Sequence, residues 1–413
     1  MSKLWTAAVA LALTGMLATT AAGHSNETLG EIDAKSGSGL SMFLEATEIN
    51  SWINVNYTYN PRGSGNDQSI NQNSNTGFHS NNDTFQLDQF WFQFDKPVTS
   101  ESRAGFHADI AFGETARSEI GVTGNDVVTI YSAYISYLAP LAYQGIRLDA
   151  GELWTLLGAE VIPVSENLNI TRGLVWGLQP VSHTGAILST QVGPVSLSFG
   201  LVNAVVSDTA IDTDRNKALT GQVKFAADTW NIAASFIHGS RLGALENSGI
   251  AIDPSDPLCS GPTGQIPPCP TFPVNNDDNR SDLGIFDLVV AGNLGEDITL
   301  YVNFDYVWSH PANLPNASTY ALAAAGRYQW NKDLGIAMRF EVVVVDPSNA
   351  QSEDEYSFTT TVDYALTDGL TARGEVRFDW GVGDKYRRAG DLYSFTGGAD
   401  NQTLLLAELI YAF

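Results

Sequence analysis

Charged side chains recur at every second position in several stretches of this chain. Arg373, Glu375 and Arg377 follow this spacing, and so do Arg339 and Glu341. A period of two is that of a β-strand, so each set would lie on one face of a strand. Charges arranged in this way attract, repel or orient ions and dipolar solutes, which is the chemistry of a pore lining.

The same alternation along the chain predicts a larger set of pore-lining residues. The candidates are Arg103, Asp109, Arg147, Asp149, Glu160, Glu166, Arg172, His183, Asp305, Arg327, Arg339, Glu341, Arg373, Glu375 and Arg377. The two signs are nearly balanced among the inward positions. The formal net charge of −25 therefore does not by itself predict a cation-selective pore.

An enzymatic barrel is an alternative with little support in the sequence. A hydrolase would need a nucleophile and a base within hydrogen-bond reach. The adjacent pairs are His24 with Ser25, His79 with Ser80 and His183 with Thr184. Neighbouring residues on a strand point to opposite faces, and no phosphate-binding loop, nucleophile elbow or zinc-binding spacing is present. We therefore expect no enzyme, no metal site and no cofactor.

The stretches that would position the charges are typical of membrane-spanning strands. Between Asp297 and Trp308, large apolar residues hold the even positions and mostly polar residues the odd ones. Such a row is about ten residues long, the span that a tilted strand needs to cross a bilayer. We predict an all-β transmembrane antiparallel barrel of about 16 strands, within a range of about 14–18. The stretches near residues 182–191 and 282–291 alternate least clearly.

A soluble β-sandwich is the other fold that alternating strands allow. It is disfavoured because it would leave many apolar rows without covering residues.

The connections between these stretches are alternately short and long. The long polar connections span residues 61–84, 113–126, 155–181, 206–217, 239–281, 309–318, 345–355 and 382–401. This layout is typical of bacterial barrels with short periplasmic turns and long external loops, and it places both termini on the short-turn side.

The N-terminus has the pattern of an export signal. Lys3 precedes an apolar run from Leu4 to Leu17, which is followed by small residues. The run is too short for a membrane anchor, so we predict a cleaved secretory signal over residues 1–23. A single barrel domain would then occupy residues 24–413.

The third long connection, residues 155–181, is unusually apolar for an external loop. We predict that it folds into the barrel and narrows the pore. The charges expected at the constriction are Glu160, Glu166 and Arg172, opposed by Arg147 or His183. The alternative is a loop that packs on the rim or between subunits.

The two cysteines, Cys259 and Cys269, both lie in the predicted external loop 239–281. Exported proteins meet an oxidising compartment, so we predict a disulfide between them. A metal site would need further ligands, and no histidine lies near them in the sequence.

Tryptophans fall into two predicted classes. The first class shares the strand face of the apolar, outward residues and would form interface girdles in the membrane. Its members are Trp230, Trp308, Trp330 and Trp380. Trp91 and Trp176 are instead candidates for the lumen, where aromatic rings can stack on sugars.

The charge balance and the C-terminus indicate the partners. With 46 acidic and 21 basic residues, the chain lacks the basic footprint of a nucleic-acid-binding protein. The last strand has apolar residues at every second position up to Phe413, which resembles the signal read by the bacterial barrel-assembly machinery. We expect outer-membrane lipid and lipopolysaccharide as surroundings, and porin analogy suggests a homotrimer. Acidic loops could recruit divalent cations that bridge lipopolysaccharide or could simply be solvated.

The middle of the chain carries a series of short motifs. They are Ile146-Arg147-Leu148-Asp149-Ala150-Gly151, Gly158-Ala159-Glu160, Asn167, Thr171-Arg172, Pro180, His183-Thr184-Gly185 and Val202-Asn203. In this order they resemble the putative β-barrel porin-2 family, also called OmpL-like. The local likeness covers about residues 146–205, and the barrel layout extends it over the mature chain. The resemblance implies an outer-membrane channel without specifying its substrate.

The function expected from the sequence is that of an outer-membrane porin, a water-filled channel for passive diffusion of small hydrophilic solutes or ions. The alternative is a structural or adhesive barrel that acts through its external loops, chiefly residues 239–281.

Overall fold

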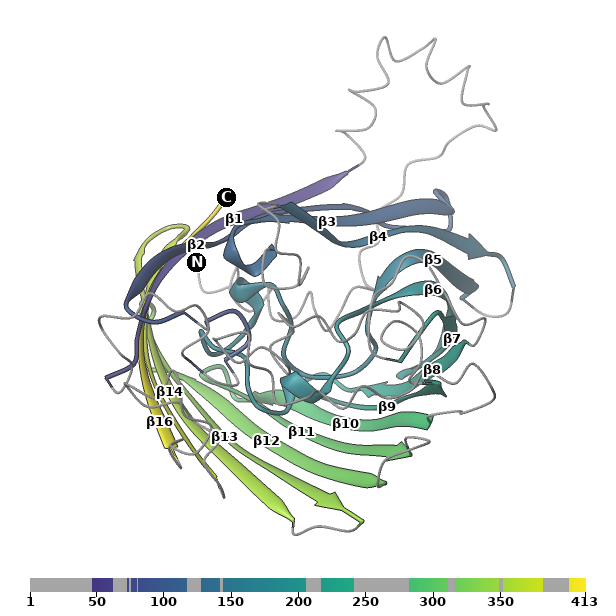
Figure 1. Ribbon diagram of the computed structural model, residues 1–413. Coiled ribbons are helices and arrows are strands. Elements are labelled where there is room, and N and C mark those ends of the chain that lie inside the picture. Colours follow the sequence, from purple (N-terminus) through teal and green to yellow (C-terminus); the bar gives the residue numbers. More distant parts are fainter. Residues whose placement is uncertain are drawn as a thin grey trace.

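The computed structural model shows a closed antiparallel β-barrel of sixteen strands (Figure 1). It describes residues 47–61, 73, 76–79, 81–116, 128–141, 144–205, 217–240, 282–310, 316–348, 352–381 and 401–413. The predicted signal segment, Cys259, Cys269 and most of loop 239–281 lie outside the described residues. The predicted fold class is confirmed.

The strands follow one another around the barrel in chain order. They are β1 (Glu48–Tyr59), β2 (Thr84–Lys96), β3 (Ala104–Phe112), β4 (Val128–Ala139), β5 (Ile146–Trp154), β6 (Ser182–Val192), β7 (Val195–Val202), β8 (Ala218–Ala226), β9 (Trp230–Ser240), β10 (Asp282–Leu294), β11 (Ile298–His310), β12 (Ala317–Gln329), β13 (Leu334–Pro347), β14 (Glu353–Thr367), β15 (Leu370–Gly381) and β16 (Asn401–Ala412). The two stretches with the weakest alternation are therefore the true strands β6 and β10.

Closure comes from pairing of the first strand with the last. Trp52 of β1 lies opposite Ala412 of β16, and every other strand pairs with its neighbours in the chain. A closed barrel leaves no strand edge unpaired, which a bilayer requires because it offers no water to hydrogen-bond the backbone. Among the described residues, no helix has the length and apolar composition needed to cross a membrane.

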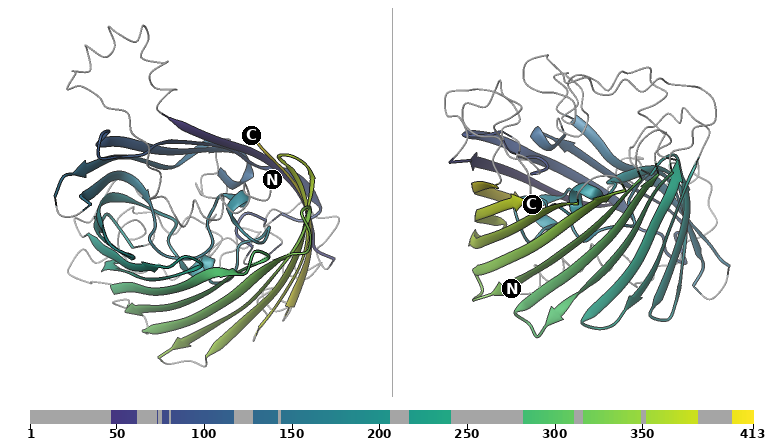
Figure 2. Two further views of the ribbon diagram at one scale, coloured as in Figure 1. Left: turned by 180° about the vertical axis from the view of Figure 1, so that it is seen from behind. Right: turned by 60° about the horizontal axis from the view of Figure 1, so that its bottom comes forward.

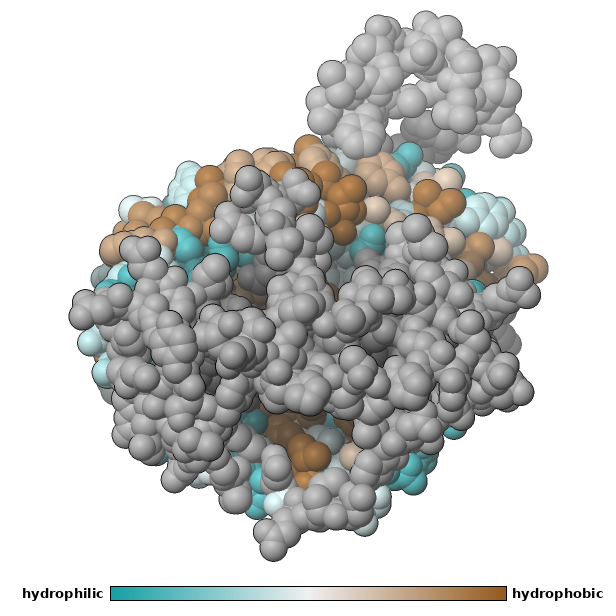
Figure 3. Space-filling model, in the orientation of Figure 1, coloured by the Kyte–Doolittle hydropathy of each residue, from teal (hydrophilic) through white to brown (hydrophobic). Residues whose placement is uncertain are grey.

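Side chains alternate between the two faces as the sequence predicts. On β11, Leu300 and Val302 are exposed on the outside, whereas Asn303 and Asp305 are buried inside. Apolar side chains gather along the outside of the wall that carries β1 to β4 (Figure 3). The outer face therefore suits lipid and the inner face carries the charges.

Two of the three register shifts lie in the wall that packs on the lumen segment, and they change which side chains point inward. Between β1 and β2 the register shifts at Asn54, so Asp88 is an extra residue and both Asp88 and Gln89 are buried. Between β3 and β4 a second shift follows Asp109, and Tyr131 becomes the extra residue. Such β-bulges break strict alternation and cannot be read from a period of two.

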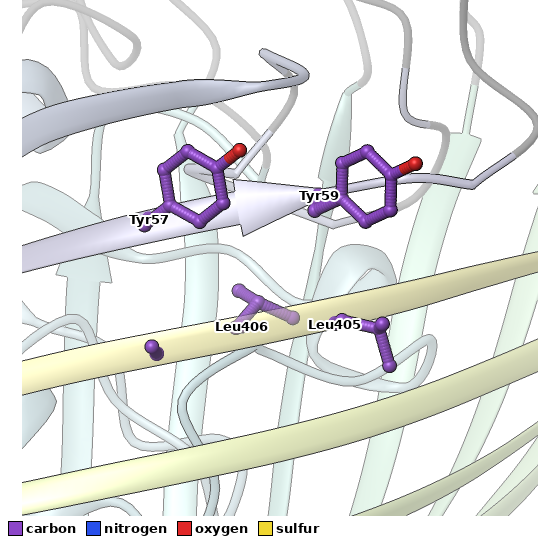
Figure 4. A pocket seen from close by; sticks show the side chains of 5 residues that line it. Tyr57, Tyr59, Leu405 and Leu406 are labelled. Atoms are coloured by element: carbon purple, nitrogen blue, oxygen red, sulfur yellow. The ribbon is translucent and has the colours of Figure 1, made fainter.

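The outer surface has a shallow apolar groove where β1 meets β16. It is lined by Tyr57, Tyr59, Leu405, Leu406 and Ala407, and it forms where the small Ala407 lies opposite the ring of Tyr57 (Figure 4). The exposed side chains of Tyr59 and Leu405 belong to the outward face. The groove opens to the lipid side of the wall and is not part of the lumen.

The connection Thr155–Val181, called the lumen segment below, lies inside the barrel (Figures 1 and 2). It contains two short 3-10 turns, η1 (Val164–Glu166) and η2 (Trp176–Leu178). Its two ends meet, because the Thr155 amide donates to the Val181 carbonyl at 3.0 Å. Its apolar residues pack against inward side chains of the wall, such as Ile170 against Leu404 and Leu406 of β16.

Placing an arginine on the outer face tests this orientation. We expect Val302→Arg to lower the free energy of unfolding by about 2–4 kcal/mol, because a charge would face the middle of the hydrocarbon. Ile298→Arg, on the same outer face but at the end of β11, is expected to cost about 1 kcal/mol or less. Urea unfolding of both variants in lipid vesicles measures the difference. Equal costs for the two would contradict the assigned membrane depth.

Candidate pore constriction

Arg339 of β13 attaches the lumen segment to the barrel wall. Its guanidinium donates to the Glu160 carboxylate and, at 2.7 Å, to the Thr171 carbonyl. Its Nε lies 2.9 Å from Glu341 on the same strand. The Glu341 carboxylate in turn accepts from the Val175 amide at 3.2 Å. The predicted pair Arg339 and Glu341 therefore lies on the inner face, but it is buried under the lumen segment.

Glu375 of β15 binds two consecutive backbone amides of the same segment. Its carboxylate accepts from the amide of Ile170 at 2.6 Å and from that of Thr171 at 3.1 Å. The Thr171 hydroxyl also donates to it at 2.6 Å. A carboxylate at this place satisfies N–H groups that an irregular backbone inside the barrel would otherwise leave unpaired.

Two arginines of β15 satisfy the carbonyl groups. Arg373 donates to the Asn167 carbonyl at 3.0 Å, and Arg377 donates to the Arg172 carbonyl at 2.6 Å. Arg377 is itself paired with Asp379 at 2.8 Å. The alternating charges of β15 thus bind the amides and carbonyls of one backbone.

Other strands hold the lumen segment from different sides of the lumen. Gln89 of β2 donates to the Ile162 carbonyl at 2.8 Å and accepts from the Val164 amide at 3.1 Å. The Leu156 carbonyl accepts from Gln222 of β8 at 2.6 Å and from Ser235 of β9 at 2.9 Å. The segment therefore spans the lumen and is fixed along its length.

Arg172 does not face a passage, contrary to the constriction hypothesis. Its side chain is 1% exposed and donates to three carbonyls of its own segment, those of Val161, Ile162 and Ile170. Burial lowers the pKa of the guanidinium below its ordinary value. Glu160 is likewise occupied by Arg339. These two charges serve the packing of the segment.

The residues expected opposite them are also occupied. His183 is buried, and its Nδ1 lies 3.2 Å from the Ala204 carbonyl. Arg147 is paired with Asp149 on its own strand at 2.7 Å. Neither forms the predicted partner of Glu160 or Arg172.

Glu166 differs from the other charged residues of the lumen segment. It is partly exposed, and the contacts of the described residues give its carboxylate no hydrogen bond and no ion pair. Burial raises its pKa to about 7, the charge of Asp109 raises it further, and His107 lowers it. Glu166 is therefore a carboxyl that changes charge near neutral pH inside the barrel.

A polar strip on β2 to β5 faces this carboxyl. Asp109 accepts from the indole N–H of Trp91 at 3.0 Å and of Trp154 at 2.8 Å. The two ring nitrogens of His107 lie 2.7 Å from Asp109 and 3.1 Å from Asp95. Carboxylate oxygens only accept, so both nitrogens carry hydrogen and His107 is an imidazolium ion. Asp95 is 35% exposed and marks the end of the strip nearest the short turns.

The remaining candidates lie at separate places. Arg103 is exposed in the turn between β2 and β3, where its Nε contacts the Ser100 carbonyl at 3.4 Å, so it does not line the lumen. Arg327 is paired with Asp363 at 2.6 Å near the short-turn end. Asp305 lies beside Asp287 in the wall.

Trp91 was expected to offer a surface for sugar stacking, but it is fully buried. Its ring is stacked between Trp52 at 5.3 Å and Tyr131 at 5.1 Å. The stack fills the space between the wall and the lumen segment. It carries no open aromatic face for a solute.

Two contributors to the site escaped the sequence analysis. Asp95 lies 3.1 Å from a ring nitrogen of His107. The only indication in the sequence was its position two residues after Gln93, on the same face of an alternating strand. Gln179 binds the β10 and β11 wall, and nothing in the sequence marks it. The predicted disulfide of Cys259 and Cys269 lies outside the described residues and stays a prediction.

Comparisons with known proteins agree with this architecture. A family model described as putative beta-barrel porin-2, OmpL-like, matches residues 46–413. No curated protein matches the chain. The fold is similar to OmpT of Vibrio cholerae, with 11% identity, a TM-score of 0.57 and coverage of 89% of this chain and 97% of that one.

Two further solved structures are similar in fold. The outer membrane channel DcaP of Acinetobacter baumannii gives 12% identity, a TM-score of 0.54 and coverage of 89% of this chain and 97% of that one. An anion-selective porin from Comamonas acidovorans gives 9% identity, a TM-score of 0.54 and coverage of 89% and 99%. At these identities the likeness concerns the fold alone.

The role of Arg339 can be tested by removing its charge. Arg339→Met would leave Glu160 and Glu341 buried without their cation, so we expect the free energy of unfolding to fall by about 3–5 kcal/mol. The matched control is Lys332→Met, because Lys332 pairs with Asp333 at the surface, and it should cause no measurable change. Urea unfolding in detergent measures both. Unfolding of Arg339→Met at the wild-type urea concentration would show that the lumen segment does not depend on this ion pair.

Proposed function

The chain belongs to the putative beta-barrel porin-2, OmpL-like, family, and from this we propose that it forms a water-filled channel for passive diffusion of small hydrophilic solutes or ions. It is a porin of the outer membrane and crosses it as a multi-pass β-barrel. A barrel of sixteen strands is too wide for its own side chains to fill, so the lumen segment sets how much of the interior stays open.

The observation that carries the proposal is the unequal burial of the inner wall. Inward charges of β13 and β15 are buried beneath the lumen segment, whereas several inward polar residues near the short-turn ends of β2 to β5 are partly exposed. Among these are Asp95, His107 and Arg147, with side-chain exposures of 35%, 11% and 22%. Water therefore reaches the short-turn end of this side of the interior, which supports a passage there, beside the stack of Trp52, Trp91 and Tyr131.

The adhesive alternative depends chiefly on loop 239–281. Most of that loop lies outside the described residues.

Conductance of the purified protein in a planar lipid bilayer tests the channel. We expect reproducible single-channel steps. The ends of the lumen segment meet, so residues 156–180 can be replaced by a short Gly/Ser linker without separating β5 from β6. This variant should give larger steps because the interior is then unobstructed. A folded wild-type barrel that gives no steps would overturn the proposal.

Glu166 provides a prediction of pH dependence. Its pKa of about 7 means that the carboxyl is neutral below that pH and negative above it. We expect the preference for K⁺ over Cl⁻ to rise roughly two- to fivefold between about pH 5 and about pH 8, since one charge near a passing ion contributes about 1 kcal/mol or less in watery surroundings. Reversal potentials in a salt gradient measure this preference.

The variant Glu166→Gln should show a lower preference for K⁺ that does not change across this pH range. Glu296→Gln, which alters an exposed carboxylate in the turn between β10 and β11, should behave as the wild type does. A pH dependence that survives in Glu166→Gln would assign the titration to another group.

A further inference from the structure

Two acidic residues lie directly opposite each other inside the barrel wall. Asp287 of β10 and Asp305 of β11 are cross-strand partners, and both are 0% exposed. No lysine, arginine or histidine of the described chain forms an ion pair with either of them. Two neighbouring carboxylates that are buried without a cation cannot both stay ionised, because repulsion and desolvation add.

The groups around the pair are hydrogen-bond donors. The Asn303 amide nitrogen donates to Asp287 at 2.6 Å and to Asp305 at 3.0 Å. The Gln179 amide nitrogen donates to Asp305 at 2.8 Å. The same Gln179 nitrogen lies 3.5 Å from Asp287. Such N–H groups suit a single negative charge.

A metal ion would need oxygen lone pairs in place of these donors. Among the described residues, no group of three or more His, Cys, Asp or Glu side chains is placed to hold a metal ion. The occupant that fits this arrangement is therefore a proton, held between one ionised and one neutral carboxyl.

The pair also holds the lumen segment at two points. Gln179 comes from the end of the segment that follows η2. Ala159, from the part that precedes η1, donates its amide to the Asn303 side-chain oxygen at 3.1 Å. The same oxygen accepts from Gln179 at 3.0 Å. Asn303 thus links both parts of the segment to the carboxyl pair.

We propose that Asp287 and Asp305 bind one shared proton and that this proton locks the lumen segment onto the wall of β10 and β11. Loss of the proton would place two like charges side by side. The repulsion is relieved when water enters the site and Gln179 gives up its contacts with the pair, which moves the segment away from the wall. The displacement widens the open part of the lumen on the side of β10 and β11 at alkaline pH.

The side chains that contact Asp287 and Asp305 do not titrate, so the pair itself is the titrating unit. The neighbouring strand β9 presents Ser235, β11 presents Asn303, and the lumen segment presents Gln179, none of which titrates. The alkaline widening rests on the proposed channel function, whereas the shared proton does not.

Infrared spectroscopy tests the proton without requiring conduction. At about pH 7.5, below the range in which the pair is expected to lose its proton, an exposed carboxyl is ionised, so a protonated carboxyl absorbs as a carboxylic acid against a carboxylate background. The spectrum of the wild type minus that of Asp287→Asn/Asp305→Asn should contain this acid band. The control variant Asp363→Asn, which alters a carboxylate paired with Arg327, should give a difference without it. A difference for the double variant that lacks the acid band would overturn the shared proton.

Conductance tests the lock and uses a variant that keeps the shape of the pair. The wild-type conductance should rise reversibly by roughly twofold or more as the pH is raised from about 8 to about 11, beyond the range of an ordinary carboxyl. Asp305→Asn has an amide in place of one carboxyl group, so the pair has no shared proton to lose. The conductance of this variant should stay constant over this range. Its folding is checked by heat-modifiable migration on a gel.

The outcomes separate the two proposals. A wild-type barrel that conducts with the same step size at both pH values would overturn the lock while leaving the porin intact. A barrel that never conducts would overturn the proposed channel function. The infrared spectrum would still show whether Asp287 and Asp305 share a proton.

Discussion

An irregular backbone inside a barrel needs partners for its own N–H and C=O groups, and the inward charges of β13 and β15 supply them. Glu375 takes two amides, while Arg339, Arg373 and Arg377 each take a carbonyl. The charges are in turn neutralised by Glu160, Glu341 and Asp379. The backbone groups of the lumen segment are thus hydrogen-bonded and the charges of the wall are paired. The lumen segment therefore has a defined position, and the space that it leaves open is defined as well.

This arrangement changes what the charges of the barrel mean for transport. An alternating row of arginine and carboxylate residues on an inner wall looks like a surface that ions pass, yet most of the row on β15 is covered. The inward charges that water reaches include those near the short-turn ends of β2 to β5, the pair Arg327 and Asp363, and Glu166. Selectivity in a barrel of this kind therefore depends on which charges the lumen segment covers and not on their total.

The period of two was sufficient to predict the barrel, the outward row of β11 and the inward set Arg339, Glu341, Arg373, Glu375 and Arg377. It could not predict Asp88 and Tyr131 as extra residues, because a bulge is a local change of register that depends on the neighbouring strand. The entry of residues 155–181 into the lumen was expected from their apolar character. The partners of Arg172 were not, since they are carbonyls brought together only by the folded path of the segment. Sequence indicates which face a charge takes, whereas its exposure depends on the segment that lies over it.

The lumen segment draws its anchors from strands far apart in the chain, with Glu375 more than two hundred positions after the amides that it binds. Gln89 precedes the segment, and β13 and β15 follow it. No subset of neighbouring strands presents all of these groups, so the segment reaches its final position only after β15 has joined the sheet. Docking of the segment is consequently a late event in assembly, and a partly closed barrel would carry a long unsupported chain in its interior.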